Sequence, residues 1–148
     1  MKLKYILFEN VDRLIDDQYE KYYDTGLELL KIKQWPKNVI ELEAILIRND
    51  SRGQGVGSKI LSDLCNYANT KNQTIILVPD ALNREVNQWS KHLSPDDVAK
   101  KIVSTTSNLI KFYSKFGFVK NEGKTLDQEM SLLQKAMGSE QLMYRRPE

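Results

Sequence analysis

A strand, a glycine-rich turn and a helix follow one another near the middle of the chain, and this succession constrains the fold more than any other feature. The segment VIELEAILI (residues 39–47) is rich in β-branched residues and predicts a strand. Three of the seven glycines of the chain then fall within residues 53–57. A helical apolar row follows, and residues 73–78 predict a second, buried strand. This order predicts a βαβ unit with two parallel strands.

The residues before this unit show weaker patterns. Residues 3–8 alternate loosely and predict a strand, and Asn10 is placed to cap a helix. Apolar residues recur at helical spacing over residues 11–32, with Gly26 as a break or bend. Residues 34–38 predict a turn. A strand and one long helical segment are therefore expected before residue 39.

The second half of the chain is less regular. Residues 94–97 combine a Ser cap, a Pro at the first helical position and two acids, which predicts a helix start. A last helix is expected over residues 106–115, ended by Gly117. Strands are expected at residues 118–119 and 141–145, whereas the pattern of residues 126–136 is ambiguous.

Composition restricts the class of protein. A length of 148 residues suits one domain, and 41% hydrophobic with 28% charged residues is typical of a soluble globular protein. The net charge of +2 argues neither for nor against nucleic acid as a partner. One cysteine permits no internal disulfide and indicates the cytoplasm, and one histidine leaves too few ligands for a Cys/His zinc site, so no metal is expected. We expect no secretion signal and no membrane span, because no apolar run approaches about 20 residues.

The glycine-rich turn has the chemistry of an anion site. A helix N-terminus presents free backbone N–H groups and a positive dipole end, and glycine lets a phosphate approach closely. The spacing fits neither the Walker A motif nor the dinucleotide motif, because Gly53, Gly55 and Gly57 are followed by Ser58 and Lys59. A plain tight turn is the alternative interpretation.

A third phosphate motif does fit. The pattern Arg52-x-x-Gly55-x-Gly57 resembles the coenzyme A loop of the GCN5-related N-acetyltransferase (GNAT) superfamily, Arg/Gln-x-x-Gly-x-Gly/Ala. The segment FYSKFGF (residues 112–118) resembles the Tyr-x-Lys-x-Gly-Phe segment of the same family, and the end of the chain resembles small phage and bacterial members. The resemblance covers residues 39–118. It implies an α/β fold with a GNAT-like mixed sheet, flanking helices and an abbreviated N-terminal part, because residues 1–38 leave little room for the family's hairpin.

The resemblance also implies a cofactor site and a domain plan. Acetyl-CoA would be the co-substrate, held by the strand, the turn and the last helix: Ile45, Leu46, Ile47, Arg52, Gly53, Gln54, Gly55, Val56, Gly57, Ser58, Thr106, Asn108 and Tyr113. The family's usual asparagine position is occupied by Thr106, which leaves that contact in doubt. One acetyltransferase domain (1–148) is expected, with an atypical N-terminal strand and helix (1–38), a coenzyme-binding core (39–120) and a C-terminal part (121–148).

Three side chains are candidates for catalysis by this resemblance. Tyr113 matches the family tyrosine that protonates the leaving thiolate, and its alternative role is a core aromatic. Glu41 and Glu43 share one face of the strand at 39–47, where a carboxylate often acts as general base. Whether either one abstracts a proton or only binds a cationic substrate is left open.

The expected function is therefore acetyl transfer from acetyl-CoA to an amine by direct attack in a ternary complex. The acceptor is a small-molecule or peptide amine of unknown identity. The alternatives are a catalytically inactive coenzyme A-binding accessory module and, on the lysines between residues 100 and 120, a nucleic-acid-associated module. Residues 80–103 are expected to form a lid or specificity wall. A homodimer would cover the sheet edge that a missing hairpin leaves exposed.

Overall fold

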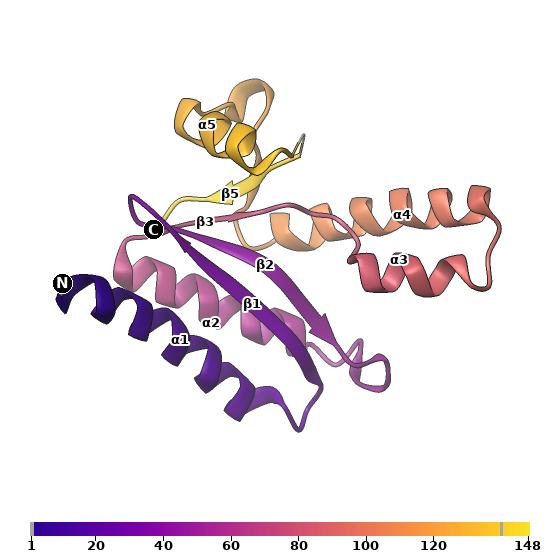
Figure 1. Ribbon diagram of the computed structural model, residues 1–148, viewed down its shortest axis with the longest axis horizontal. Helices are drawn as coiled ribbons and strands as arrows, with labels where there is room; N and C mark the ends of the chain where they lie inside the picture. Colours follow the sequence, from indigo (N-terminus) through magenta and orange to yellow (C-terminus); the bar gives the residue numbers. More distant parts are fainter. Residues whose placement is uncertain (1, 140) are drawn as a thin grey trace. The chain divides into compact units, whose positions relative to one another are not determined.

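The computed structural model describes residues 2–139 and 141–148, with side chains from residue 11 onward except at residue 83. The chain divides into two compact units, and its helices and strands are labelled in Figure 1. The first unit contains residues 1–77 and 145–148, and the second contains residues 78–144. The chain belongs to the α/β class, with a mixed sheet and flanking helices, as the sequence predicts.

The first unit is built on a β-hairpin followed by the predicted βαβ unit. Strands β1 (Leu27–Trp35) and β2 (Val39–Ile47) pair antiparallel, and β2 pairs in parallel with β3 (Thr74–Leu77). A short 3-10 helix (Asn49–Ser51) and the glycine turn lead into helix α2 (Val56–Lys71). The prediction of two parallel strands joined through a helix is confirmed.

Helices α1 (Lys2–Tyr22) and α2 cover the same face of the hairpin (Figure 1). Helix α2 buries the apolar row that its sequence spacing predicts: Ile60, Leu61, Leu64, Cys65 and Ala68. From the hairpin, the alternating side chains of β2 point into this core, including Ile40, Leu42 and Leu46. At β1, the N–H of Leu30 donates to the Tyr19 hydroxyl at 2.8 Å, which ties α1 to the strand next to an irregularity in its pairing.

The N-terminal prediction is wrong in two respects. Residues 3–8 are part of α1 and not a strand, so Asn10 lies inside a helix and not at its start. Residues 27–32 are not a continuation of a helix but belong to β1. The chain therefore does contain a hairpin before the glycine turn, and β1 pairs the edge of β2 that appeared unpaired from the sequence. A homodimer stays a prediction, but an unpaired edge of β2 is no longer a reason to expect one.

The second unit contains one long helix, two shorter helices and a short two-stranded pairing. Helix α3 (Asn83–Ser90) lies beside α4 (Pro95–Ser114), and β4 (Val119–Lys120) pairs antiparallel with β5 (Met143–Arg145). Ser94 caps α4 as predicted, because its side chain accepts the N–H of Asp97. The last helix is longer than expected, since α4 runs unbroken through the Ser/Thr-rich residues 104–107. The ambiguous segment becomes helix α5 (Gln128–Met137).

In each unit, one buried polar side chain joins separate segments by hydrogen bonds. In the second unit, buried Asn121 donates to Ser131 Oγ and Gln134 Oε1 at 3.1 and 3.0 Å and accepts the N–H of Asp127 at 2.8 Å. In the first unit, buried Arg145 donates to Asn69 Oδ1 at 2.9 Å. None of the helices in residues 2–139 and 141–148 has the length and apolar character that crossing a bilayer requires.

Candidate functional site

The glycine turn has a left-handed backbone that only glycine adopts without strain. Gly53 has φ +83° and Gly55 has φ +78°, and a Cβ built on either residue would meet nothing within 4 Å. Glycine is therefore required at these positions by backbone conformation and not by crowding. The open space beside both residues leaves the backbone accessible, and residues 52–55 are exposed.

The glycine turn leads directly into the N-terminus of α2, where the first backbone N–H groups lack an intrahelical acceptor. Gly55 precedes α2 as its N-cap, and the first hydrogen bond of the helix runs from the N–H of Lys59 to Gly55 O at 3.1 Å. The N–H groups of Gly55 to Ser58, which precede the donor of that first bond, have no intrahelical acceptor. A row of free N–H groups at the positive end of a helix dipole is the arrangement that binds phosphate.

Strand β2 leaves its parallel neighbour before it reaches the turn. The pairing with β3 covers Val39–Thr74 through Leu42–Leu77, and β2 continues from Glu43 to Ile47 beyond it (Figure 1). Along this stretch, β2 keeps its antiparallel pairing with β1, including Leu30 with Ile45 and Leu29 with Leu46. The side of β2 that faces β3 is thus without a β3 partner at Ile45, Leu46 and Ile47, where the sequence places the contact with an extended ligand.

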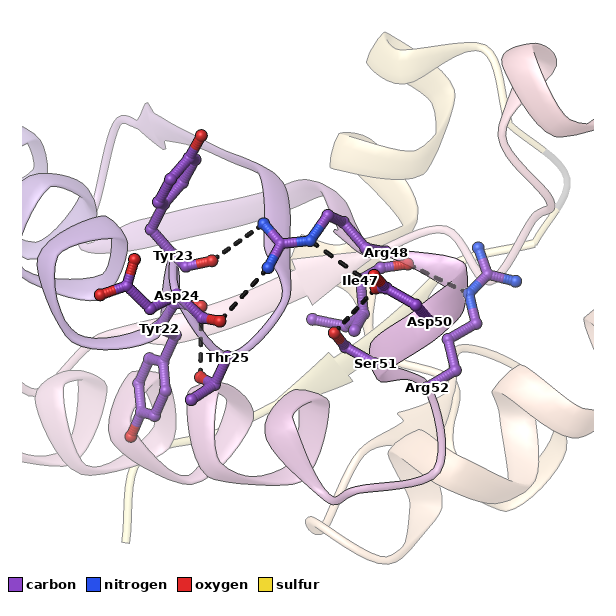
Figure 2. A network of polar contacts seen from close by, with 9 residues as sticks. All are labelled: Tyr22, Tyr23, Asp24, Thr25, Ile47, Arg48, Asp50, Ser51 and Arg52. Atoms are coloured by element: carbon purple, nitrogen blue, oxygen red, sulfur yellow. Dashed lines mark hydrogen bonds and ion pairs between the residues drawn. The ribbon is translucent and has the colours of Figure 1, made fainter.

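Two arginines precede the glycine turn, and they make different contacts (Figure 2). Arg48 points back toward the end of α1, where its guanidinium donates to the backbone carbonyls of Tyr23 and Asp24 at 2.9 and 3.3 Å. Arg52 is exposed, and its Nε donates to Ile47 O at 3.1 Å, while the rest of its guanidinium points away from Arg48 (Figure 2). Arg48 therefore holds the chain in place, and Arg52 lies at the rim of the turn.

Glu41 and Glu43 lie on the less buried face of β2, as the period of two predicts. The burial of β2 alternates, with Glu41 half-buried and Glu43 exposed, whereas Ile40 and Leu42 are buried on the other face. Glu41 Oε1 accepts a hydrogen bond from Trp35 Nε1 at 2.7 Å. The two carboxylates therefore have different surroundings although they share a face.

The remaining predicted residues lie on α4, in the second unit. Tyr113 is buried, with its ring edge-on to those of Phe112 and Phe118 at centroid distances of 5.4 and 5.7 Å. Burial raises the pKa of Tyr113 to about 12, so the phenol is protonated at neutral pH. Thr106 is half-buried and Asn108 is exposed on the same helix. The aromatic packing shows that Tyr113 has a structural role whether or not it is also a proton donor.

The structure thus brings together the predicted residues of the first unit, on β2, the turn and the start of α2. The contact that sequence reasoning missed is the one between Trp35 and Glu41. The two residues are separated by a hairpin turn in which Lys37 and Asn38 both have positive φ, at 61° and 60°. The only sequence signal for it is a Trp at the start of a turn that precedes an acid-bearing strand.

No protein-family model, no curated protein and no solved structure matches the chain. The geometry of the glycine turn and of β2 is therefore the basis on which a function is proposed.

Proposed function

We propose that the protein is an N-acetyltransferase that transfers the acetyl group of acetyl-CoA to an amine by direct attack in a ternary complex. The observation that carries the proposal is the glycine turn, which leads into the N-terminus of α2, where the N–H groups of Gly55 to Ser58 have no intrahelical acceptor. The separation of β2 from β3 supports it, because an extended thioester arm can pair with backbone that β3 leaves unpaired.

Different residues of the first unit would bind different parts of acetyl-CoA. The turn from Gly53 to Ser58 would hold the pyrophosphate, with exposed Arg52 as a cation beside it. The backbone of Ile45 to Ile47 would bind the pantetheine arm. The roles of Thr106 and Asn108 come from the sequence resemblance and stay predictions.

The transfer needs one proton acceptor and one proton donor. The amine nitrogen forms a bond to the acetyl carbon, and the carbon–sulfur bond then breaks. The proton lost by the amine goes to a carboxylate of β2, directly or through water, and the leaving thiolate takes a proton from a donor, the role that the sequence resemblance assigns to Tyr113. The products are an N-acetyl amine and the free thiol, and exchange with water restores both side chains. Tyr113 carries its proton at neutral pH, as a donor must, although burial raises its pKa to about 12 and so makes it a weaker acid than a free tyrosine.

Calorimetric titration with acetyl-CoA tests the site. The native chain is expected to bind in the micromolar range, and Gly55→Glu is expected to abolish binding, because the carboxylate repels phosphate at the dipole end. Gly55→Ala is the matched control: it introduces the same backbone strain at φ +78° without the charge and should weaken binding less. No binding by the native chain would overturn the proposal.

An acceptor screen then separates the enzyme from its main alternative. Spermidine, a peptide with a free N-terminus and a lysine-containing peptide serve as probes, with thiol release as the readout. Turnover with any of them supports the transferase. Binding of acetyl-CoA without turnover on a broad amine panel would favour a coenzyme-binding accessory module. We also propose a cytoplasmic location, which the single, buried cysteine supports.

A further inference from the structure

We propose that Trp35 is a positioning residue that fixes Glu41 as the proton acceptor of the reaction, and that Glu43 takes no part in proton transfer. The inference rests on the proposed acetyl transfer. It decides between two carboxylates that the sequence leaves equivalent, and it gives a role to a tryptophan that lies outside every motif.

The contact itself is short and directional. Trp35 Nε1 donates to Glu41 Oε1 at 2.7 Å, which occupies one carboxylate oxygen and leaves the other for a substrate amine or a water. An indole N–H is a donor only, so it cannot take up the proton that the carboxylate receives. The bond therefore orients the carboxylate without competing in the chemistry.

Two further contacts act on Trp35, and they are linked to the rest of the hairpin through Gln34. Its carbonyl accepts a hydrogen bond from Gln34 Nε2 at 2.8 Å, and the same nitrogen donates to Val39 O at 3.1 Å. Lys33 Nζ lies over the indole ring, 4.5 Å from its centroid. Gln73 Nε2 donates to Gln34 Oε1 at 3.3 Å, which links this turn to the chain segment that begins β3. A donor fixed in this way can hold Glu41 in one rotamer.

Charge also distinguishes the two carboxylates. Lys33 lies directly opposite Glu41 in the β1–β2 pairing, so Glu41 is on a face that carries a neighbouring cation and an indole. Glu43 is exposed and takes part in no hydrogen bond or ion pair within the described part of the chain. A solvated carboxylate with free rotamers lacks the orientation that efficient proton abstraction needs.

The first experiment observes the hydrogen bond without activity. Trp35 and Trp89 are the two tryptophans, so Trp89→Phe leaves a single indole N–H signal in the nitrogen–proton spectrum. In this background, Glu41→Gln is expected to shift the Trp35 signal, and Glu43→Gln is expected to leave it in place. An unmoved signal in Glu41→Gln, or an equal shift in Glu43→Gln, would overturn the inference.

The second experiment measures the consequence for turnover with whichever amine probe is acetylated. Glu41→Gln should lower kcat about 100-fold or more, and Glu43→Gln less than about threefold. Trp35→Phe should lower kcat about tenfold while the Kd for acetyl-CoA changes less than about twofold, since the indole does not touch the coenzyme site. Tyr23→Phe is the control, because this exposed ring of the first unit also lies beside a cation, Arg48 at 5.6 Å.

A double variant separates positioning from a general structural role. Trp35→Phe is expected to have no further effect on kcat in the Glu41→Gln background, because a lost carboxylate can no longer be misplaced. Additive losses would show that Trp35 acts through packing alone and would overturn the inference. If the native chain does not bind acetyl-CoA, that result counts against the proposed function. The indole signal would still decide whether Trp35 holds Glu41.

Discussion

Arg48 donates a hydrogen bond from its guanidinium to the backbone carbonyl of Tyr23, at 2.9 Å, and so ties the strand before the glycine turn to the end of α1 (Figure 2). The same guanidinium donates to Asp24 O at 3.3 Å, and the Arg48 backbone N–H donates to Gly26 O at 2.8 Å. Carbonyls just beyond a helix C-terminus carry partial negative charge and favour a cation. Arg48 therefore links the segment after β2 to the connection between α1 and β1.

Replacing Arg48 by Met should lower the free energy of unfolding by about 1–2 kcal/mol, because it removes two charge-assisted hydrogen bonds from a partly exposed side chain. Urea denaturation of the native chain and the variant measures the difference. Arg13→Met, at an exposed position of α1, is the matched control and should change stability by less than about 0.5 kcal/mol. Equal effects of the two substitutions would show that the Arg48 contacts contribute nothing.

Gly26→Ala should be one of the most damaging small changes in the first unit. A Cβ at Gly26 would lie 2.4 Å from Ser51 Cβ and 3.3 Å from Ile47 Cγ2, at a φ of +129°. Strain and overpacking together should cost about 2–4 kcal/mol, measured as the loss of unfolding free energy.

Gly138→Ala separates these two causes, because Gly138 has φ +68° but open space around its Cβ position. It should cost only the strain, about 1–2 kcal/mol. Adding Ser51→Gly to Gly26→Ala should recover part of the loss by removing the clashing atoms. No recovery would show that the backbone conformation alone is responsible.

The sequence predicts the βαβ unit well because several local signals agree there. The alternation of β2, the glycines and the apolar row of α2 each determine their element independently of long-range contacts. The region before residue 39 lacks this agreement. Residues 27–32 suit a helix as well as a strand, and the antiparallel pairing with β2 selects the strand.

The candidate site was predictable only where it depends on backbone conformation. Glycines at positive φ next to a helix N-terminus follow from the motif, and the faces of Glu41 and Glu43 follow from the period of β2. The bond from Trp35 to Glu41 does not, because it depends on a turn with positive φ at Lys37 and Asn38 that brings the two residues together. The sequence predicts a turn at residues 34–38, but it predicts neither the positive φ values nor the register of the β1–β2 pairing.

The thiol of Cys65 should be unreactive in the folded protein. Cys65 is buried on the inner face of α2, and burial raises the pKa of its thiol, an effect that Arg145 opposes and Glu148 reinforces. Iodoacetamide at neutral pH should therefore modify the native chain only as fast as the first unit opens. The rate of modification should rise steeply with urea. Rapid modification without denaturant would contradict the burial.

The stability of the protein should fall at alkaline pH in a way that depends on Tyr113. Burial raises the pKa of this phenol from 10.0 to about 12 in the folded chain, so the folded state holds the proton more tightly than the unfolded state. The resulting stabilisation is fully present below pH 10 and is lost as the pH rises through about 12. Between about pH 9 and 11, this one group should account for about 1 kcal/mol of lost unfolding free energy.

Tyr113→Phe removes the titrating group and keeps the ring that packs against Phe112 and Phe118. Urea titrations of both chains at about pH 9 and 11 should therefore show a shallower loss in the variant. Tyr22 and Tyr67, whose pKa values burial also raises, are present in both chains and cancel in the comparison. Parallel losses in the two chains would contradict this prediction. They would mean that the Tyr113 phenol reaches water in the folded state and loses its proton at the same pH as a free tyrosine.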